Sequence, residues 1–186
     1  MLSSIPELVY LAPATKEEYL AMLDWSLEQN AYPVAIKVPG GPVVSSGTPC
    51  TKDFSRLNTY EVTQRGKKAA LIGAGVFYDM AEETARMIEE KTGTAPTVVN
   101  PMYLSGLDET LLEQLKADHD VVVTLEDGYV DGGFGEKIAR FYGNSKVKVL
   151  NYGIRKAFYD RYDAMELLRE NRMTPEQVTE DVLNLL

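Results

Sequence analysis

The segment from Ala69 to Gly153 alternates between short apolar runs and longer stretches with helical periodicity. The apolar runs are AALIGAG (69–75), PTVVNPMYL (96–104), DVVVTLE (120–126) and KVKVLNYG (146–153), and the helical stretches between them are 76–93, 109–117 and 132–143. Buried strands separated by helices pair in parallel through right-handed crossovers. The pattern therefore predicts an α/β fold, a three-layer, mostly parallel sheet with helices on both faces.

A smaller strand–helix–strand unit precedes this segment. LVYLA (8–12) and VAIKV (34–38) are the predicted strands. The helix between them starts with T-K-E-E, in which Thr15 caps the helix and Glu18 reaches back. We expect the buried face of this helix to consist of residues spaced three and four apart: Leu20, Leu23 and Leu27.

The domain organisation follows from a change in composition. Residues 40–59 are rich in Gly, Pro, Ser and Thr and show no sustained period, so we interpret them as a linker. YEVTQ, from Tyr60, is the next predicted strand, and two helices close the chain, the second with Thr174 as its cap. The predicted parts are therefore 1–39, the linker 40–59, and 60–186.

Composition excludes several classes of function. The chain has 28 acids and 19 bases, a net charge of −9 and no basic stripe, so we expect neither a nucleic-acid partner nor an anionic membrane surface. No apolar run approaches the ~20 residues of a membrane span, and no secretion signal is visible at the start, which makes the cytoplasm the expected location. Cys50 is the only cysteine in the sequence and His119 is the only histidine, which excludes a metal cluster built from His and Cys ligands. We interpret His119, within KADHD, as a solvated loop residue.

Two glycine-rich turns follow predicted strands. GAGVFYD (73–79) resembles part of a dinucleotide fingerprint, but Tyr78 replaces its third glycine and no acid follows about 20 residues later, where Asn100 is nearest. We therefore favour a tight turn there. GGFG (132–135) also opens a helix, where free amides attract anions.

Acids rather than bases surround GGFG, so a phosphate would be repelled. The acids are Glu126, Asp127, Asp131 and Glu136. We favour a corner in which Gly132, Gly133 and Gly135 allow close backbone packing, with nearby acids capping helices. Glu126 and Asp127 are adjacent on a strand and point to opposite faces, which argues against a catalytic pair. Lys37, at a strand end, is the candidate for binding a substrate phosphate, with a surface lysine as the alternative.

Taken in order, several segments resemble one family. IPELVYLAPATKEEYLAMLDWSLEQNAYPVAIKVPGG resembles the closing strand–helix–strand of the pyrimidine-binding domain of transketolase-type thiamine-diphosphate enzymes. TVVNPMYLSGLDETLLEQLKADHDVVVTLEDGYVDGGFGEKIARFY resembles their C-terminal domain, and NYGIRKAFYDRY favours the 1-deoxy-D-xylulose-5-phosphate synthase branch. The resemblance assigns 1–39 to the pyrimidine-binding domain and 60–186 to the C-terminal domain. It implies a homodimer and the N-terminal diphosphate- and pyrimidine-binding portions as partners.

The chain departs from the family at three residues and lacks two of the family's functional features. KVPGG stands where the family has RYPRG, so Lys37 and Gly40 replace two arginines, and Ser105 replaces a lysine. The family's metal-binding G-D-G…N motif and its cofactor-activating glutamate have no counterpart here. The resemblance therefore implies thiamine diphosphate and Mg²⁺ in the parent enzyme, with no cofactor, catalytic or metal-binding residue in this chain.

Three hypotheses follow. The first is a C-terminal fragment or subunit of the synthase, which condenses pyruvate with glyceraldehyde 3-phosphate; it would serve assembly and be inactive alone. Because the chain starts inside an expected domain, we favour an excised part over a natural subunit. The second is a non-catalytic interaction module of the same fold. The third is a β-subunit fragment of a 2-oxo-acid dehydrogenase first component.

Overall fold

A five-stranded sheet forms the centre of the computed structural model, which describes residues 2–41 and 43–186. The strand order is β3-β5-β4-β6-β7, with β3 (Glu61–Gln64), β4 (Lys68–Gly73), β5 (Thr97–Asn100), β6 (His119–Tyr129) and β7 (Lys148–Ile154). All neighbours pair in parallel except β3, which is antiparallel to β5 at one edge. The predicted mostly parallel sheet is confirmed.

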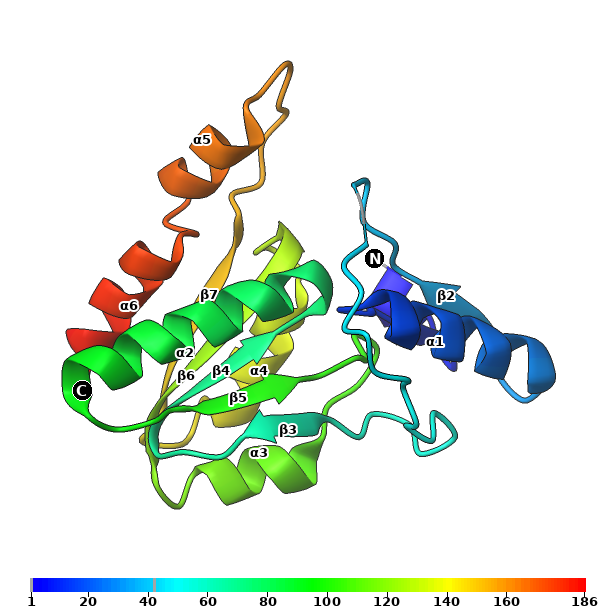
Figure 1. Ribbon diagram of the computed structural model, residues 1–186, viewed down its shortest axis with the longest axis horizontal. Coiled ribbons are helices and arrows are strands. Elements are labelled where there is room, and N and C mark those ends of the chain that lie inside the picture. The colour runs from blue at the N-terminus through cyan, green and yellow to red at the C-terminus, as the bar shows by residue number, and fades with distance from the viewer. Residues whose placement is uncertain (1, 42) are drawn as a thin grey trace.

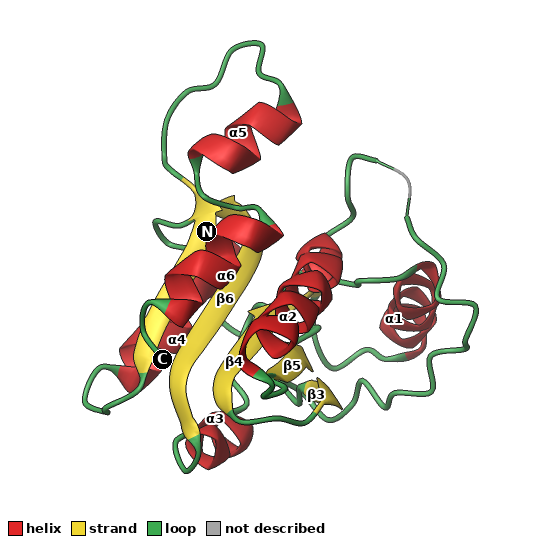
Figure 2. Ribbon diagram, turned by 60° about the vertical axis from the view of Figure 1, so that its left-hand side comes forward, coloured by secondary structure: helices red, strands yellow, loops and turns green. Residues whose placement is uncertain are grey.

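Helices cover both faces of this sheet (Figures 1 and 2). On one face lie α2 (Tyr78–Thr92), which follows the short turn η2 (Gly75–Phe77), and α6 (Pro175–Leu183); on the other lie α3 (Glu109–Leu115) and α4 (Phe134–Tyr142). The alternation along β4 explains the two cores: Ala69 and Leu71 pack toward α2, whereas Ala70 and Ile72 pack toward α3 and α4. The predicted three layers are therefore present.

The N-terminal unit contains a separate parallel pair, β1 (Val9–Leu11) and β2 (Val34–Ile36), connected by α1 (Lys16–Glu28) and preceded by η1 (Leu2–Ser4). Backbone hydrogen bonds join it to the loop after β5, from Ala12 N–H to Met102 O (2.8 Å) and from Leu104 N–H to Tyr10 O (2.7 Å). Its buried side chains belong to the same core as α3 and α4. The two sheets are thus packed against each other.

The predicted buried face of α1 is wrong. Leu20 is 45% exposed and Leu27 is 77% exposed, whereas Met22 is fully buried. Trp25 packs on Phe54, with ring centroids 6.3 Å apart. Phe54 belongs to the segment predicted as a linker, whose described residues (40–41 and 43–59) form no helix or strand. Phe54 is nevertheless 2% exposed, and its contact with Trp25 selects which face of α1 is covered. The proposed domain boundaries stay a prediction.

Side-chain caps lie at the starts of four helices. Thr15 accepts a hydrogen bond from Glu18 N–H, and Asp108 accepts one from Leu111 N–H. Asp163 caps α5 (Ala164–Glu170), and Thr174 caps α6. Each cap satisfies an amide that the helix itself leaves free.

His119 is not a solvated loop residue. It is 6% exposed at the start of β6, with Nε2 2.8 Å from Thr97 Oγ1 and Nδ1 3.0 Å from Leu115 O. The sequence interpretation fails because the ring contacts Thr97, which lies 22 residues away on β5 and which no local pattern identifies. The ring ties β5 and α3 to the sheet, which is a structural role.

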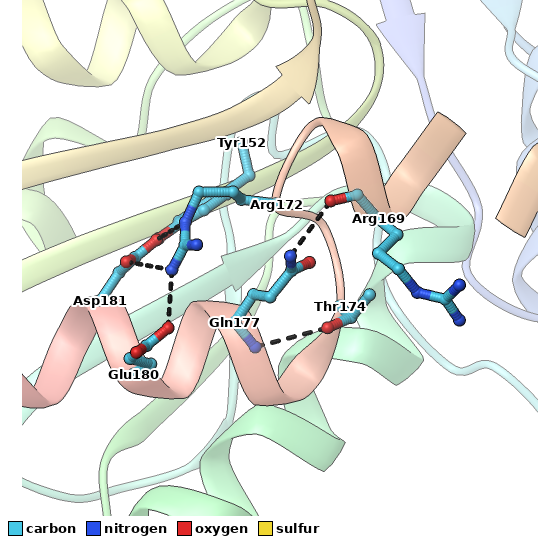
Figure 3. A network of polar contacts seen from close by, with 7 residues as sticks. All are labelled: Tyr152, Arg169, Arg172, Thr174, Gln177, Glu180 and Asp181. Atoms are coloured by element: carbon cyan, nitrogen blue, oxygen red, sulfur yellow. Dashed lines mark hydrogen bonds and ion pairs between the residues drawn. The ribbon is translucent and has the colours of Figure 1, made fainter. Parts of the chain in front are cut away.

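The C-terminal helices are fixed to the sheet by a polar network (Figure 3). Arg172 donates to Asp181 Oδ1 (2.6 Å) and to Glu180 Oε2 (2.9 Å), and Tyr152 of β7 donates to Asp181 Oδ2 (2.9 Å). Gln177 Nε2 donates to Arg169 O (3.1 Å), which joins α5 to α6. These contacts hold α6 against β7 and join α5 to α6. No helix among the described residues is long and apolar enough to cross a membrane.

Candidate functional site

The predicted site residues meet where β6 ends and the N-terminal unit packs on the large sheet. A cavity of about 230 Å³ lies there. Its lining includes Lys37 after β2, Glu126 and Asp127 of β6, and Gly132 and Gly133 before α4. The carboxyl end of a parallel strand is where open α/β sheets usually bind ligands. The following contacts determine what this cavity can hold.

Glu126 is the centre of the corner and is 9% exposed. Its carboxylate accepts hydrogen bonds from Phe134 N–H and Gly135 N–H, both at 2.8 Å. Burial raises the pKa of Glu126, while these two amides and the charge of Lys37 act in the opposite direction. The first free amides of α4 are therefore already occupied by an acid of this chain, one of the caps anticipated from the sequence.

The three glycines of the corner have different surroundings. A Cβ on Gly133 would lie 2.5 Å from Glu126 Oε1 and 2.7 Å from Tyr129 O. A Cβ on Gly135 would lie 2.5 Å from Thr124 Oγ1. A Cβ on Gly132 would meet no heavy atom of the described residues within 4 Å, and the φ of +72° is what favours glycine there. Close packing therefore explains the need for glycine at positions 133 and 135, whereas the backbone conformation explains it at position 132.

Lys37 faces Asp127 across the junction of the two sheets. Its Nζ donates to the backbone carbonyl of Asp127 and lies 3.6 Å from Asp127 Oδ2. The Lys37 side chain is 30% exposed, so it lines the cavity while its charge is partly matched by Asp127. A phosphate at this position would have to compete with Asp127 for the ammonium group.

Ser105, where the family has a lysine, lies at the same junction. Its hydroxyl accepts from Tyr10 N–H at 3.3 Å. Lys137 of α4 donates to Leu104 O and Ser105 O, both at 2.9 Å. The lysine of α4 thus binds the loop after β5, and Ser105 connects that loop to β1.

The corner does not fit a diphosphate. The N–H groups of Phe134 and Gly135 are bound to Glu126, and Asp127 and Asp131 add negative charge to the cavity lining. No group of three or more His, Cys, Asp or Glu side chains suitable for a metal ion occurs within residues 2–41 and 43–186. Packing between elements is the function that these contacts support.

The GAGVFYD turn leads through η2 into α2. Asn100, the nearest candidate for holding a ribose, is 2% exposed and donates through Nδ2 to Glu18 Oε1 at 2.8 Å. That amide is therefore engaged within the protein. The arrangement agrees with the tight turn favoured from the sequence.

The Glu18–Asn100 pair is a polar contact that sequence reasoning missed. Glu18 of α1 also accepts from Ala14 N–H at 2.7 Å, and it is 9% exposed. Both residues line a cavity of about 970 Å³ beside β3. Asn100 Oδ1 has no hydrogen-bond partner among the described residues. Burial, with repulsion from Glu61, raises the pKa of Glu18. The only signal in the sequence was the capping pattern of Glu18, which does not identify a partner 82 residues away.

This pair predicts a pH dependence of stability. Because the folded-state pKa of Glu18 is raised, the folded protein binds the proton more tightly than the unfolded chain, whose Glu pKa is about 4.3. The contribution of Glu18 is therefore greatest at low pH and falls as pH rises from about 4.3 through the raised folded value.

The Glu18→Gln variant should lack this fall. The new amide can still accept from Ala14 N–H, and its NH₂ can donate to Asn100 Oδ1 once the Asn100 amide turns over. Urea unfolding of both proteins across pH 4 to 8, a range chosen to bracket the ordinary Glu pKa of about 4.3, measures the difference. Equal pH slopes in the two proteins would contradict the assignment.

Comparison with known proteins assigns the family. The Transketolase, C-terminal domain family matches residues 58–178. A 1-deoxy-D-xylulose-5-phosphate synthase from Clostridium botulinum (strain Alaska E43 / Type E3) is 30% identical over 186 residues, covering 98% of this chain and 29% of that protein. The synthase of Symbiobacterium thermophilum is 32% identical over 189 residues, covering 100% of this chain and 28% of that protein. The chain spans less than a third of these relatives.

Solved structures agree on the fold. One described as "Split gene transketolase, inactive beta4 tetramer" has a TM-score of 0.78 at 24% identity and covers 100% of this chain and 59% of that one. A Pichia stipitis transketolase (mutant R525L) has a TM-score of 0.70 at 17% identity, covering 98% of this chain and 25% of that one. The chain therefore belongs to the transketolase C-terminal domain family and resembles the C-terminal part of the 1-deoxy-D-xylulose-5-phosphate synthases.

Proposed function

We propose that this chain is the C-terminal part of a thiamine-diphosphate-dependent 1-deoxy-D-xylulose-5-phosphate synthase and that it acts in assembly and dimerisation. By family resemblance, the parent reaction condenses pyruvate with glyceraldehyde 3-phosphate and releases carbon dioxide. Thiamine diphosphate and Mg²⁺ would be held by N-terminal diphosphate- and pyrimidine-binding portions, with which this chain associates in the cytoplasm. On its own the chain would be inactive.

One observation carries the proposal. The family domain covers residues 58–178, yet the synthases match 98–100% of the chain, including the β1–α1–β2 unit that precedes this domain. A chain with both units in this order corresponds to the end of a synthase. The contacts at the corner argue against a phosphate site there, because Phe134 N–H and Gly135 N–H are bound to Glu126 and a Cβ on Gly133 or Gly135 would clash. The assembly role rests on the family resemblance.

Reconstitution tests this function. The purified chain is mixed with a candidate N-terminal chain that carries the diphosphate- and pyrimidine-binding portions, and carboligation of pyruvate with glyceraldehyde 3-phosphate is followed. We expect activity from the mixture and none from either chain alone. A complex without activity would favour the non-catalytic interaction module. Activity of this chain alone would overturn the proposal, and capture of an acyltransferase core would favour the dehydrogenase β-subunit.

A further inference from the structure

The loop between β7 and α5 projects from the body in both views (Figures 1 and 2). We call residues 155–165, which include the first turn of α5, the arm. Its large apolar side chains are exposed: Phe158 is 108% exposed, Tyr162 is 61% exposed and Met165 is 62% exposed. Large apolar side chains gathered on a projecting segment are typical of a protein–protein contact rather than of a free surface.

Hydrogen bonds and ring contacts order the arm, although its large apolar side chains are exposed in the part of the chain that the structure describes. Arg155 N–H donates to Asn171 Oδ1 at 2.9 Å, which ties the start of the arm to the end of α5. Tyr159 OH donates to Arg155 O at 2.7 Å, and the rings of Tyr159 and Tyr162 are 6.1 Å apart, edge to face. Tyr129 OH of β6 donates to Ala157 O at 2.9 Å. A preformed arm loses little conformational entropy when it binds a partner.

The charge of the arm identifies the kind of partner. The arm has three bases, Arg155, Lys156 and Arg161, and two acids, Asp160 and Asp163, in a chain with 28 acids and 19 bases. Asp163 is already used as the cap of α5. Within residues 2–41 and 43–186, Arg155, Lys156 and Arg161 make no ion pair. The partner surface should therefore be acidic with an apolar component.

The chain itself offers such a surface on α2. The outer side of this helix exposes five acids. Two of them, Glu83 and Glu90, form ion pairs with Arg86. The other three are Asp79, Glu82 and Glu89. Val76, just before the helix, is 40% exposed. Because the arm and the acidic face belong to the same chain, each of two copies related by a two-fold axis can dock its arm on the acidic face of the other. The contact is then made twice.

We infer that the arm docks on the acidic outer face of α2 of a second copy of this chain, with Phe158, Tyr162 and Met165 as its apolar contacts. This inference rests on the dimerisation role proposed above and identifies the two surfaces that would form the dimer interface. Buried aromatic anchors supply most of the binding energy in such contacts, and the bases of the arm select the acidic face.

Sedimentation velocity of the full 186-residue chain tests the inference. We expect a dimer whose dissociation constant rises roughly 30-fold or more in the triple variant Phe158→Ser/Tyr162→Ser/Met165→Ser. The thermal midpoint should stay unchanged at a protein concentration at which both proteins are monomeric, because the replaced side chains are exposed in the monomer. The dimer should weaken with salt, and Arg155→Glu/Arg161→Glu should weaken it further.

The matched control is Leu20→Ser/Leu27→Ser, which removes exposed apolar side chains from α1 instead of the arm. It should leave the dimer intact. The inference is overturned by a chain that stays monomeric at all accessible concentrations, by a triple variant that dimerises normally, or by loss of the dimer in the α1 control. It is also overturned if the arm variants block binding of an N-terminal chain but not self-association. Carboligase reconstitution tests the proposed function separately from these outcomes.

Discussion

Replacing Glu126 by alanine is expected to lower the free energy of unfolding by about 2–4 kcal/mol. The carboxylate satisfies two amides at the start of α4, Phe134 N–H and Gly135 N–H, and it is 9% exposed. Alanine leaves both donors without a partner in a buried position. Urea unfolding followed by circular dichroism measures the loss.

Two controls accompany this prediction: a conservative change of Glu126 itself and a change of its neighbour Asp127. Glu126→Gln retains one carbonyl oxygen, so one of the two amides keeps its partner and an intermediate loss is expected. Asp127→Ala removes the neighbouring carboxylate, which is 52% exposed and pairs with Lys37, so its cost should be below about 1 kcal/mol. An Asp127→Ala loss as large as that of Glu126→Ala would show that Glu126 does not act as a buried cap.

Replacing Gly135 by alanine should cost about 1–3 kcal/mol. The added Cβ would lie 2.5 Å from Thr124 Oγ1 and 2.9 Å from two atoms of the Asn151 side chain, so β6, β7 or α4 has to shift. Thr124 cannot simply rotate away, because it is fully buried and donates to Asn151 Oδ1 at 2.8 Å. Thermal and urea unfolding report the loss.

Gly143, at the other end of α4, is the matched control. A Cβ there would be 3.4 Å from its nearest neighbour, Arg140 O, and the φ of −53° is helical. Gly143→Ala should change stability by less than about 1 kcal/mol, and reduced freedom of the unfolded chain favours a small gain. Equal losses at Gly135 and Gly143 would indicate that close packing is not what requires glycine at position 135.

The main sheet could be predicted because each strand carries its own signal. Continuous apolar runs such as DVVVTLE identify strands buried on both faces, and the helices between them require parallel pairing. The position of β3 was predictable and its direction was not, since its pairing with β5 is set by contacts across the sheet edge. Helix starts were predictable because caps such as Thr174 act within three residues.

The failures share one physical cause, which is contact between distant parts of the chain. The buried face of α1 is chosen by Phe54, which lies in a segment without periodicity. The ring of His119 is buried against Thr97, which lies 22 residues away on β5. The partner of Lys37 is Asp127, 90 residues away, and the partner of Glu18 is Asn100, 82 residues away. Local sequence patterns do not specify any of these contacts.

The claim on which the account depends is that coenzyme binding resides outside this chain. Isothermal titration calorimetry with thiamine diphosphate and Mg²⁺ tests it directly. The account predicts no binding by the chain alone with a dissociation constant below about 1 mM, and binding once an N-terminal portion is present. Saturable binding by the chain alone, weakened when Gly132 or Gly133 is replaced by alanine, would contradict it.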